Sequence, residues 1–349
     1  MNDKLDQVMA TGNAPGHQYI AANSHKILVE YAGGWADVRG ERRMELDTTM
    51  MLYSMTKTFT AAAVLQLAEQ GKVRLEDPAV NSVPDIPYGS TVLIRHLLSQ
   101  TSGIPHPLPL RWVHPADEQG EFDEHAALAA VLRQNSRLNF PPGEKYRYSN
   151  ISYWLLGRVI EKASGTSYED YMRRNIFARL GIPLTDMDFV IPSPSRHAKG
   201  YFPKYSCLNL FKSLLFDSQY FGSSEGRWVH IRDHYLNGPA YGGIVASSRA
   251  VVAFLQDQLR ETSVLFTNTT RATSFEQQKS NDGTLLPMTL GWHIGSLDRR
   301  RYYFKEGGGG GYHSEMRIYP DKGVGTVMIG NSAAFKAGNL LNMADKAFL

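Results

Sequence analysis

Residues 50–72 read MMLYSMTKTFTAAAVLQLAEQGK, and this stretch decides the fold and the chemistry that we expect. The mostly apolar body of the stretch, followed by Gly71, predicts a helix from Ser54 to Gln70 that ends at the glycine. Ser54 then lies near the helix N-terminus and Lys57 lies one turn later, so both side chains project from the same face. Ser54 and Lys57 are therefore candidates for a nucleophile and its base.

A serine beside a lysine has a defined use in catalysis. A serine hydroxyl is a poor nucleophile until a neighbouring base takes its proton, and a lysine does so only if burial or nearby positive charge lowers its pKa. The helix N-terminus also offers the backbone N–H of Ser54 to a developing oxyanion. A four-residue motif also arises by chance, so the rest of the chain must support it.

The composition is that of an ordinary globular protein. The chain has 349 residues, 42% hydrophobic and 20% charged, enough for one large core or two moderate ones. The formal net charge is only +3, and lysines and arginines are scattered apart from short clusters such as residues 299–301. We therefore expect no nucleic acid among the partners.

The N-terminus and the single cysteine bear on the compartment. Residues 1–16 contain no apolar run typical of a secretory signal, and no later apolar stretch reaches the length of about 18 residues that spans a membrane. We expect a cytoplasmic protein with no membrane partner, unless a leader was removed. Cys207 is the only cysteine, so it forms no internal disulfide and is expected to be a half-buried small side chain.

Two kinds of pattern divide the chain. Apolar alternation around Gly33-Gly34 predicts a two-stranded hairpin near the start, and alternation between residues 289 and 331 predicts antiparallel strands near the end. Between them, residues 151–165 and 167–183 read as helices that end at glycine. The middle of the chain is therefore expected to be mostly helical.

The simplest architecture is an α/β (α+β) fold, an antiparallel β-sheet flanked by helices. Residues 1–80 and 235–349 would form this sheet domain, and residues 81–234 would be a mostly helical domain inserted into it.

Three separated segments resemble, in the same order, the motifs of the serine β-lactamase and penicillin-binding-protein family. They are Ser54 to Lys57, then Tyr148-Ser149-Asn150, and then Lys305-Glu306-Gly307 six residues before Gly311-Tyr312. The second motif resembles the class C branch with its esterases and D-peptidases. The resemblance extends from about Val29 to Asn331 and implies a β-lactamase/transpeptidase-like fold.

Secondary segments agree with this resemblance. Residues 97–103, LLSQTSG, resemble the Leu-Leu-x-His-Thr-Ser-Gly segment of the family, with Gln100 in place of the frequent histidine. Pro142-Gly143 precedes the second motif, and residues 240–243 resemble the Gly-Gly segment before a helix. The sequence does not indicate what Gln100 changes.

The resemblance implies a role for each motif side chain. Ser54 would be the acylated nucleophile, and Lys57 its proton acceptor or electrostatic activator. Tyr148 would be a second base, for Ser54 or for the deacylating water. Asn150 would orient Lys57 and the substrate carbonyl, and the positive charge of Lys305 would keep Tyr148 acidic.

The third motif also implies the oxyanion hole and the substrate contacts. The backbone N–H groups of Ser54 and Gly308 would bind the oxyanion, and Glu306, Gly307 and Gly308 would contact the substrate. Relatives that bind carboxylates carry Thr or Ser where this chain has Glu306. A carboxylate substrate would meet like charge if Glu306 faced the site, whereas strand alternation turns it away if Lys305 faces the site.

Each motif residue also has a purely structural interpretation. Tyr148 could be a half-buried aromatic, Asn150 a helix N-cap, and Lys305 a strand-edge lysine. The Gly-x-Ser-x-Gly pattern at residues 222–226 lacks the strand before it and the helix after it that an α/β-hydrolase elbow needs.

We expect a serine hydrolase that forms an acyl-serine intermediate and needs neither metal nor organic cofactor. His230 and His234 are spaced like a metal pair but lack a third ligand. The substrate would be a small ester or amide, and a homo-oligomer stays open. Pocket-lining residues are expected in aromatic-rich loops, for example Trp112, Tyr220, Phe221 and Trp228.

The leading hypothesis for the activity is a carboxylesterase acting on small acyl esters. Within the same class, the alternatives are a D-amino-acid peptidase or amidase and a weak β-lactamase or D,D-carboxypeptidase. The alternative of another class is a penicillin-binding or ligand-sensing protein that does not turn over.

Overall fold

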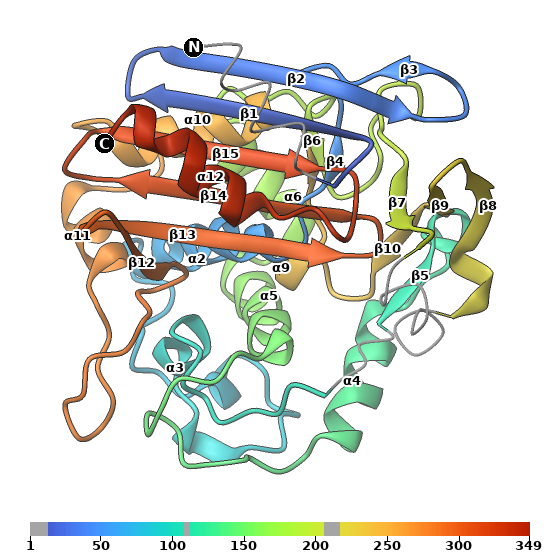
Figure 1. The fold of residues 1–349 in the computed structure, drawn as a ribbon. Coiled ribbons are helices and arrows are strands. Elements are labelled where there is room, and N and C mark those ends of the chain that lie inside the picture. The colour runs from blue at the N-terminus through green and yellow to red at the C-terminus, as the bar shows by residue number, and fades with distance from the viewer. Residues whose placement is uncertain (1–12, 108–111, 206–216) are drawn as a thin grey trace.

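The structure, a computed structural model, describes residues 13–107, 112–205 and 217–349 (Figure 1). Cys207 and most of the N-terminal segment lie outside the described residues. The described ranges contain the antiparallel sheet flanked by helices that the sequence predicts. None of the helices in these ranges is long and apolar enough to cross a membrane.

One seven-stranded antiparallel sheet combines strands from both ends of the chain, in the order β12-β13-β14-β15-β1-β2-β3. Its strands are β1 (Gly16–Asn23), β2 (Ile27–Asp37), β3 (Arg42–Arg43), β12 (His293–Leu297), β13 (Arg300–Gly309), β14 (Tyr312–Tyr319) and β15 (Val324–Gly330). His17 of β1 pairs with Gly33 on one side and Gly330 on the other. The strand β1 therefore lies between its hairpin partner β2 and the last strand of the chain, β15.

The predicted two-stranded hairpin near the start is present, but it turns at residues 24–26 and not at Gly33-Gly34. Both glycines lie inside β2 and pair with β1. Gly34 has a φ of +81°, and a Cβ there would lie 2.1 Å from the carbonyl oxygen of Pro15. The glycine permits a close approach of two backbones, a use that local sequence does not distinguish from a turn.

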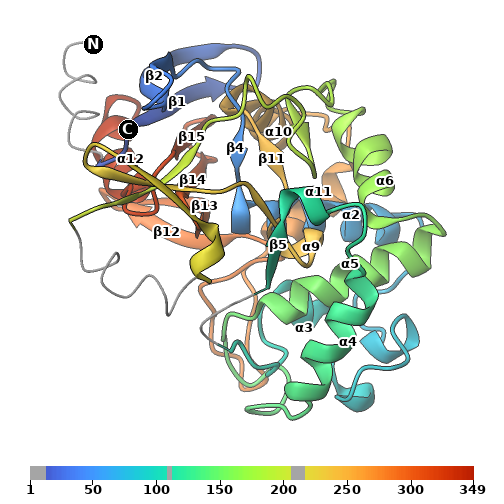
Figure 2. The same ribbon diagram turned by 90° about the vertical axis from the view of Figure 1, so that its right-hand side faces the viewer.

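Helices cover both faces of the sheet (Figures 1 and 2). On one face, α12 (Ala337–Ala344) packs against β14 and β15, and on the other α10 (Ser248–Leu259) packs against β1 and β15. The helix α2 (Thr56–Glu69) is buried along residues 56–67 on all sides, as its short, apolar side chains allow. Ser54 lies directly before it, in the 3₁₀ turn η1 (Tyr53–Met55).

The middle of the chain carries helices and also several short strands. The helices are α3 (Ile94–Leu98), α4 (Glu124–Gln134), α5 (Asn150–Ser164), α6 (Tyr168–Met172), and the π-helical turn η5 (Arg173–Phe177). The strands are β5 (Val113–Pro115), β6 (Met187–Asp188), β7 (Gly200–Pro203), β8 (Phe221–Glu225), β9 (Trp228–Ile231) and β10 (His234–Leu236). Since α5 packs on α2, one hydrophobic core continues across both regions, and the predicted domain limits stay a prediction.

The remaining short elements connect these parts. They are β4 (Met50–Met51), β11 (Val245–Ala246), α9 (Pro239–Gly242), α11 (Asn268–Phe275), η2 (Ala79–Asn81), η3 (Gly89–Thr91), η4 (Ala116–Glu118), η6 (Ser218–Tyr220) and η7 (Asp345–Ala347).

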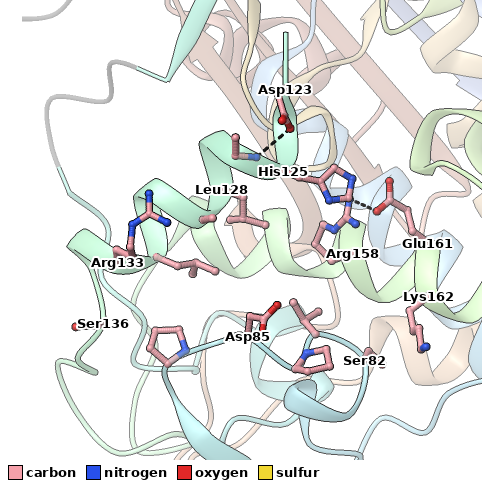
Figure 3. A pocket seen from close by; sticks show the side chains of 16 residues that line it. Ser82, Asp85, Asp123, His125, Leu128, Arg133, Ser136, Arg158, Glu161 and Lys162 are labelled. Carbon is pink, nitrogen blue, oxygen red and sulfur yellow. Dashed lines mark hydrogen bonds and ion pairs between the residues drawn. The ribbon is translucent and has the colours of Figure 1, made fainter.

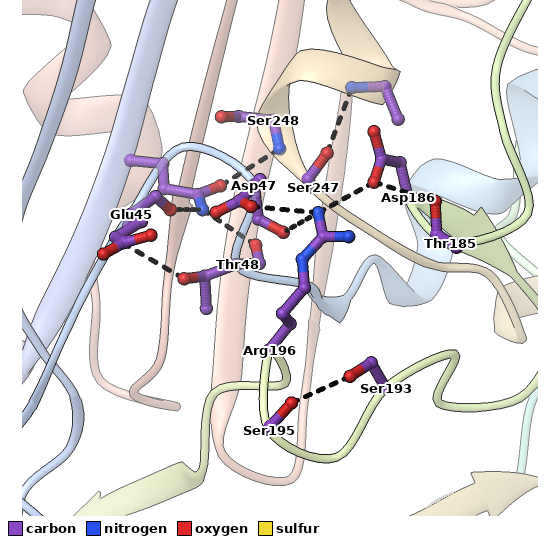
Figure 4. A network of polar contacts seen from close by, with 12 residues as sticks. Glu45, Asp47, Thr48, Thr185, Asp186, Ser193, Ser195, Arg196, Ser247 and Ser248 are labelled. Atoms are coloured by element: carbon purple, nitrogen blue, oxygen red, sulfur yellow. Dashed lines mark hydrogen bonds and ion pairs between the residues drawn. The ribbon is translucent and has the colours of Figure 1, made fainter.

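A polar network anchors the chain just before β4 (Figure 4). Arg196 donates to Asp186 Oδ1 at 2.8 Å and to the backbone oxygen of Asp47 at 3.0 Å. Gln18 of β1 donates to the backbone oxygen of Thr48 at 2.8 Å and accepts from Ser248 N–H at 3.0 Å. These contacts connect the sheet, α10 and the segment that leads to Ser54.

Candidate active site

Ser54 and Lys57 are in direct contact, as the Ser-x-x-Lys spacing predicts. Lys57 Nζ lies 3.0 Å from Ser54 Oγ, 2.8 Å from Asn150 Oδ1 and 2.6 Å from the backbone oxygen of Tyr241. The last two atoms only accept hydrogen bonds, so they take two N–H groups of the amine. A neutral amine then has its lone pair left for the hydroxyl hydrogen of Ser54.

The surroundings of Lys57 favour this neutral form. Burial lowers the pKa of Lys57 well below its ordinary value, and the positive charge of Lys305 lowers it further. The side chain is fully buried, with Nζ 4.9 Å from the ring centroid of Tyr148 and 5.5 Å from that of Tyr241. Lys57 therefore meets the condition for a base that removes the proton of Ser54.

Tyr148 completes the contacts of the serine, because its hydroxyl lies 2.5 Å from Ser54 Oγ. Burial raises the pKa of Tyr148 above its ordinary value, and the hydrogen bond with Ser54 opposes the rise only in part. The expectation that Lys305 keeps Tyr148 acidic therefore does not hold for the free site. The raised pKa favours the protonated phenol, which can donate a hydrogen bond to Ser54 Oγ.

Asn150 lies at the start of α5, where its side chain faces Lys57. It is the first helical residue, and the N-cap position belongs to Ser149, whose side chain makes no capping bond. The Asn150 amide oxygen instead accepts a hydrogen bond from Lys57. The N-cap interpretation of Asn150 is therefore wrong.

Lys305 faces the same site from β13. Its side chain is buried and its Nζ lies 5.2 Å from the ring centroid of Tyr148, without a hydrogen-bond partner among the described residues. Burial lowers the pKa of Lys305 to about 7, although the charge of Glu306 opposes the shift. The site thus contains one buried donor that a bound molecule could satisfy.

Glu306 points to the other face of the sheet. Its carboxylate accepts a hydrogen bond from His313 Nε2 at 2.7 Å, because successive side chains of β13 alternate and Lys305 faces Ser54. Like-charge repulsion of a carboxylate substrate by a site-facing Glu306 therefore does not apply. The hydroxyl that relatives carry at this position is still missing.

The glycines after Glu306 bring the backbone of β13 next to Ser54. Pairing between β12 and β13 stops at Phe304, and the rest of β13 packs against η1. A Cβ on Gly307 would lie 2.0 Å from the backbone oxygen of Leu52, so only glycine allows this approach. This placement suits the predicted oxyanion hole of Ser54 and Gly308.

Gln100 holds the segment that carries Tyr148, which the sequence did not reveal. Its backbone oxygen accepts from Arg147 N–H at 2.8 Å, and its side-chain oxygen accepts from Ser149 N–H at 2.6 Å. Gln100 is buried with a φ of +60°, a strained conformation for a residue with a side chain. The only sequence signal was its position in the LLSQTSG segment.

His106 is a second residue that sequence reasoning missed. Its ring stands edge-on to Tyr148 with centroids 5.2 Å apart, and burial lowers its pKa to about 4. It is therefore neutral and adds no positive charge. It follows the LLSQTSG segment closely, which was the only available signal.

The predicted pocket aromatics fall into two groups. Trp112 lies against Tyr241, whose backbone oxygen accepts from Lys57. Tyr220 lies edge-on to His234, which contacts the hydroxyl of Tyr53. Phe221 and Trp228 belong to β8 and β9, which form a small sheet with β7.

The competing motifs do not form sites. Residues 222–226 form β8 and the turn that leads into β9, without the helix that an α/β-hydrolase elbow needs. Within the ranges that the structure describes, no group of three His, Cys, Asp or Glu side chains is placed to hold a metal. A groove of about 1130 Å³ between α4, α5 and residues 82–87 contains none of the motif residues (Figure 3).

Comparisons with known proteins agree with this geometry. The family model described as Beta-lactamase matches residues 1–347. The chain is 28% identical over 326 residues to penicillin-binding protein 4* of Bacillus subtilis (strain 168). The matched region covers 90% of this chain and 68% of that protein. It is 28% identical over 204 residues to protein flp of Staphylococcus aureus (strain N315), but this match spans only 40% of that protein and 56% of this chain.

Solved structures share the fold across the chain. The D-amino acid amidase from Ochrobactrum anthropi SV3 has a TM-score of 0.82 at 21% identity, covering 99% of this chain and 96% of that one. The octameric penicillin-binding protein homologue from Pyrococcus abyssi has a TM-score of 0.76 at 22% identity, covering 99% and 76%. The predicted β-lactamase/transpeptidase-like fold is confirmed.

Proposed function

The chain belongs to the β-lactamase family of serine hydrolases, and from this premise we propose that it hydrolyses small carboxylic esters through an acyl intermediate on Ser54. The observation that supports the proposal most directly is the contact between Ser54 Oγ and Lys57 Nζ. The two other hydrogen-bond partners of Lys57 Nζ, the Asn150 side-chain oxygen and the Tyr241 backbone oxygen, are both acceptors. A nucleophile in contact with a base whose neutral form is favoured by burial is the arrangement that acylation requires.

In acylation, Ser54 Oγ attacks the ester carbonyl while its proton passes to Lys57. The oxyanion binds the backbone N–H groups of Ser54 and Gly308. When the tetrahedral intermediate collapses, the hydroxyl of Tyr148 gives its proton to the leaving alcohol, since it lies 2.5 Å from Ser54 Oγ. The acyl-enzyme then holds a protonated Lys57 and an ionised Tyr148.

Deacylation reverses these proton transfers. The phenolate of Tyr148 takes a proton from water, which attacks the acyl carbon, and Lys57 returns its proton to Ser54 as the acid leaves. The nearby charge of Lys305 stabilises the phenolate at this stage, because an opposite charge favours the ionised form. Lys305 therefore acts on the acyl-enzyme more than on the free enzyme.

A second candidate function is the hydrolysis of amides, including D-amino acid amides. An amine leaves an acyl carbon only after it is protonated, and a neutral Tyr148 close to Ser54 is a suitable proton donor. The similarity in fold to a D-amino acid amidase points the same way. Because Glu306 faces away, charge also gives no reason to reject D-peptides or penicillins, or a protein that binds them without turnover.

We expect brief exposure to a p-nitrophenyl ester to leave an acyl adduct on the wild-type protein, detected by intact-protein mass spectrometry. The adduct and the release of nitrophenol should disappear in Ser54→Ala. Ser224→Ala is the matched control, because Ser224 is an exposed serine in the rival Gly-x-Ser-x-Gly pattern and its variant should react normally. If the Ser54→Ala variant still formed the adduct and the Ser224→Ala variant did not, the proposed nucleophile would be refuted.

The substrate class can be measured with matched esters and amides of D- and L-phenylalanine and with a penicillin. Faster turnover of the esters would favour the carboxylesterase, and selective turnover of the D-amide would favour the second candidate. A stable penicillin adduct without turnover of any substrate would favour the binding protein. A cytoplasmic location and a homo-oligomer stay predictions.

We expect Lys305→Met to slow deacylation more than acylation, by about tenfold to a hundredfold, because it removes the charge that stabilises ionised Tyr148. A burst of nitrophenol followed by slow turnover would show this in stopped-flow kinetics. The acid limb of the acylation rate should also move to higher pH, since Lys305 helps to lower the pKa of Lys57. An unchanged ratio of burst to turnover would contradict this role.

The same variant should raise the free energy of unfolding. The folded protein holds Lys305 with a pKa of about 7, and the unfolded chain has its ordinary value of about 10.4, so folding stability rises with pH between these values. Below pH 7 Lys305 is charged in both the folded and the unfolded protein, so the full free-energy cost of burying the charge lowers stability there. Lys305→Met should therefore stabilise the protein most at or below pH 7, as denaturation at several pH values would show.

A further inference from the structure

Two buried residues of the described ranges have a strained, left-handed backbone without being glycine. The non-glycine residues with positive φ are Asn13, Glu41, Tyr53, Gln100, Asp298 and Arg299. Four of these are exposed, while Tyr53 and Gln100 are buried beside the active site. Such strain costs about 1–3 kcal/mol and persists only where the surroundings hold it. Tyr53 directly precedes Ser54, so its backbone sets the direction of the Ser54 N–H.

The side chain of Tyr53 reaches the strand that carries the other predicted oxyanion donor. Its hydroxyl donates to the backbone oxygen of Gly310 at 2.8 Å and lies 3.1 Å from His234 Nε2. Its ring lies against Gly309, where a Cβ would come within 2.5 Å of the ring carbons. Tyr53, the residue before Ser54, thus contacts Gly309 and Gly310, the two residues after Gly308.

Another polar link between the two segments is longer. Ser314 Oγ lies 3.4 Å from the backbone oxygen of Leu52 and 3.3 Å from that of Gly307. The Tyr53 bond to Gly310 is shorter and buried, and Tyr53 is the residue directly before Ser54. This bond is therefore the shortest of these polar links, and it restricts the separation of the two segments.

We propose that Tyr53 is the positioning residue of the oxyanion hole, and that its hydroxyl fixes the distance between the N–H groups of Ser54 and Gly308. The inference rests on the proposed function. The two donors come from segments more than 250 residues apart, so only tertiary contacts set their spacing. An oxyanion needs both donors at about 2.7–3.1 Å, and a misplacement of about 1 Å costs up to about a hundredfold in rate.

The test is Tyr53→Phe, which keeps the ring against Gly309 and removes only the hydroxyl. For a p-nitrophenyl ester, kcat should fall by about tenfold to a hundredfold while KM stays unchanged, because the loss concerns the transition state. Inhibition by phenylboronic acid, which forms a tetrahedral adduct on the serine, should weaken by the same factor. Active enzyme is counted by titrating Ser54.

Tyr88→Phe is the matched control. Tyr88 is also buried and donates its hydroxyl to a backbone oxygen, that of Asn135 at 2.7 Å, in a region without motif residues. It should lose a similar amount of thermal stability and keep its kcat and its boronate affinity. This separates a structural loss from a loss in the oxyanion hole.

Three results would overturn the inference. Unchanged kcat and boronate affinity in Tyr53→Phe would show that the hydroxyl does not position the donors. A fall in kcat that is explained by a smaller number of titratable Ser54 sites, or that also occurs in Tyr88→Phe, would show a structural role only. Failure of the wild type to form a Ser54 adduct would instead refute the proposed function itself, and this is measured before any Tyr53 variant.

Discussion

Replacing Lys57 with methionine is expected to lower the rate of Ser54 acylation by about 10²–10⁴-fold, the contribution typical of a general base. Methionine fills the space of the lysine stem but has no basic nitrogen. Ser54 would keep its contact with Tyr148, which cannot replace the base because burial holds its proton in place. The burst phase of p-nitrophenyl ester hydrolysis, followed by stopped flow, measures this rate.

The pH dependence distinguishes a base from a packing residue. Lys57 acts only when neutral, so wild-type acylation should slow as pH falls through its lowered pKa and stay level just above it. The Lys57→Met variant should lose this acid limb together with the rate. Lys162→Met, at an exposed position of α5, is the control and should keep both. A Lys57→Met enzyme with the wild-type acid limb would refute the role.

The largest expected effect on stability comes from Arg317, where methionine should lower the free energy of unfolding by about 3–5 kcal/mol. The Arg317 side chain on β14 is 2% exposed and donates to Asn342 Oδ1 and to the backbone oxygen of Gly338, both in α12. It donates to Glu315 Oε1 at 2.6 Å and lies 3.5 Å from Asp345 Oδ2. Its removal would leave two buried carboxylates without their cation, which costs more than the pair contributes.

The effect of Arg317→Met should depend on pH. Burial raises the pKa of Asp345 to about 6, above its unfolded value of about 3.9, so folding stability falls as pH rises between these values. Loss of Arg317 raises this pKa further. The destabilisation should therefore be largest above pH 6 and smaller near pH 4, where the carboxylates bind protons.

Urea denaturation of wild type and variant at these two pH values measures the difference. Arg300→Met provides the control, because Arg300 of β13 forms an exposed ion pair with Asp321 and its loss should cost no more than about 1 kcal/mol. Equal losses in the two variants would contradict the importance of burial at Arg317.

Local patterns were sufficient for much of the fold. The apolar run that ends at Gly71 predicted α2 to within a few residues, and alternation predicted the C-terminal strands. These signals depend on residues that are near neighbours in sequence. The turn of the first hairpin was misplaced at Gly33-Gly34 because glycine serves both turns and close backbone approach, and only the position of Pro15 distinguishes the two uses.

For the site, the motif order predicted which side chains meet but not how they act. Contacts of Ser54 with Lys57 and Tyr148 follow the sequence prediction, whereas burial reversed the expected acidity of Tyr148. The direction of Glu306 depended on which face of β13 packs on η1. The sequence placed Gln100 in a family segment without revealing its role and gave no signal for Tyr53, because the partners of both residues are distant in the chain.

The sequence alone determined the family, the main helices and strands, and the candidate nucleophile and base. These properties depend on residue type and short spacing. Tertiary structure alone decided the lowered pKa of Lys57 and the raised pKa of Tyr148, the side of the sheet that Glu306 faces, and the link from Tyr53 to Gly310. Each of these depends on burial or on contact between segments far apart in the chain, and a pKa or a distance exists only after those segments pack together.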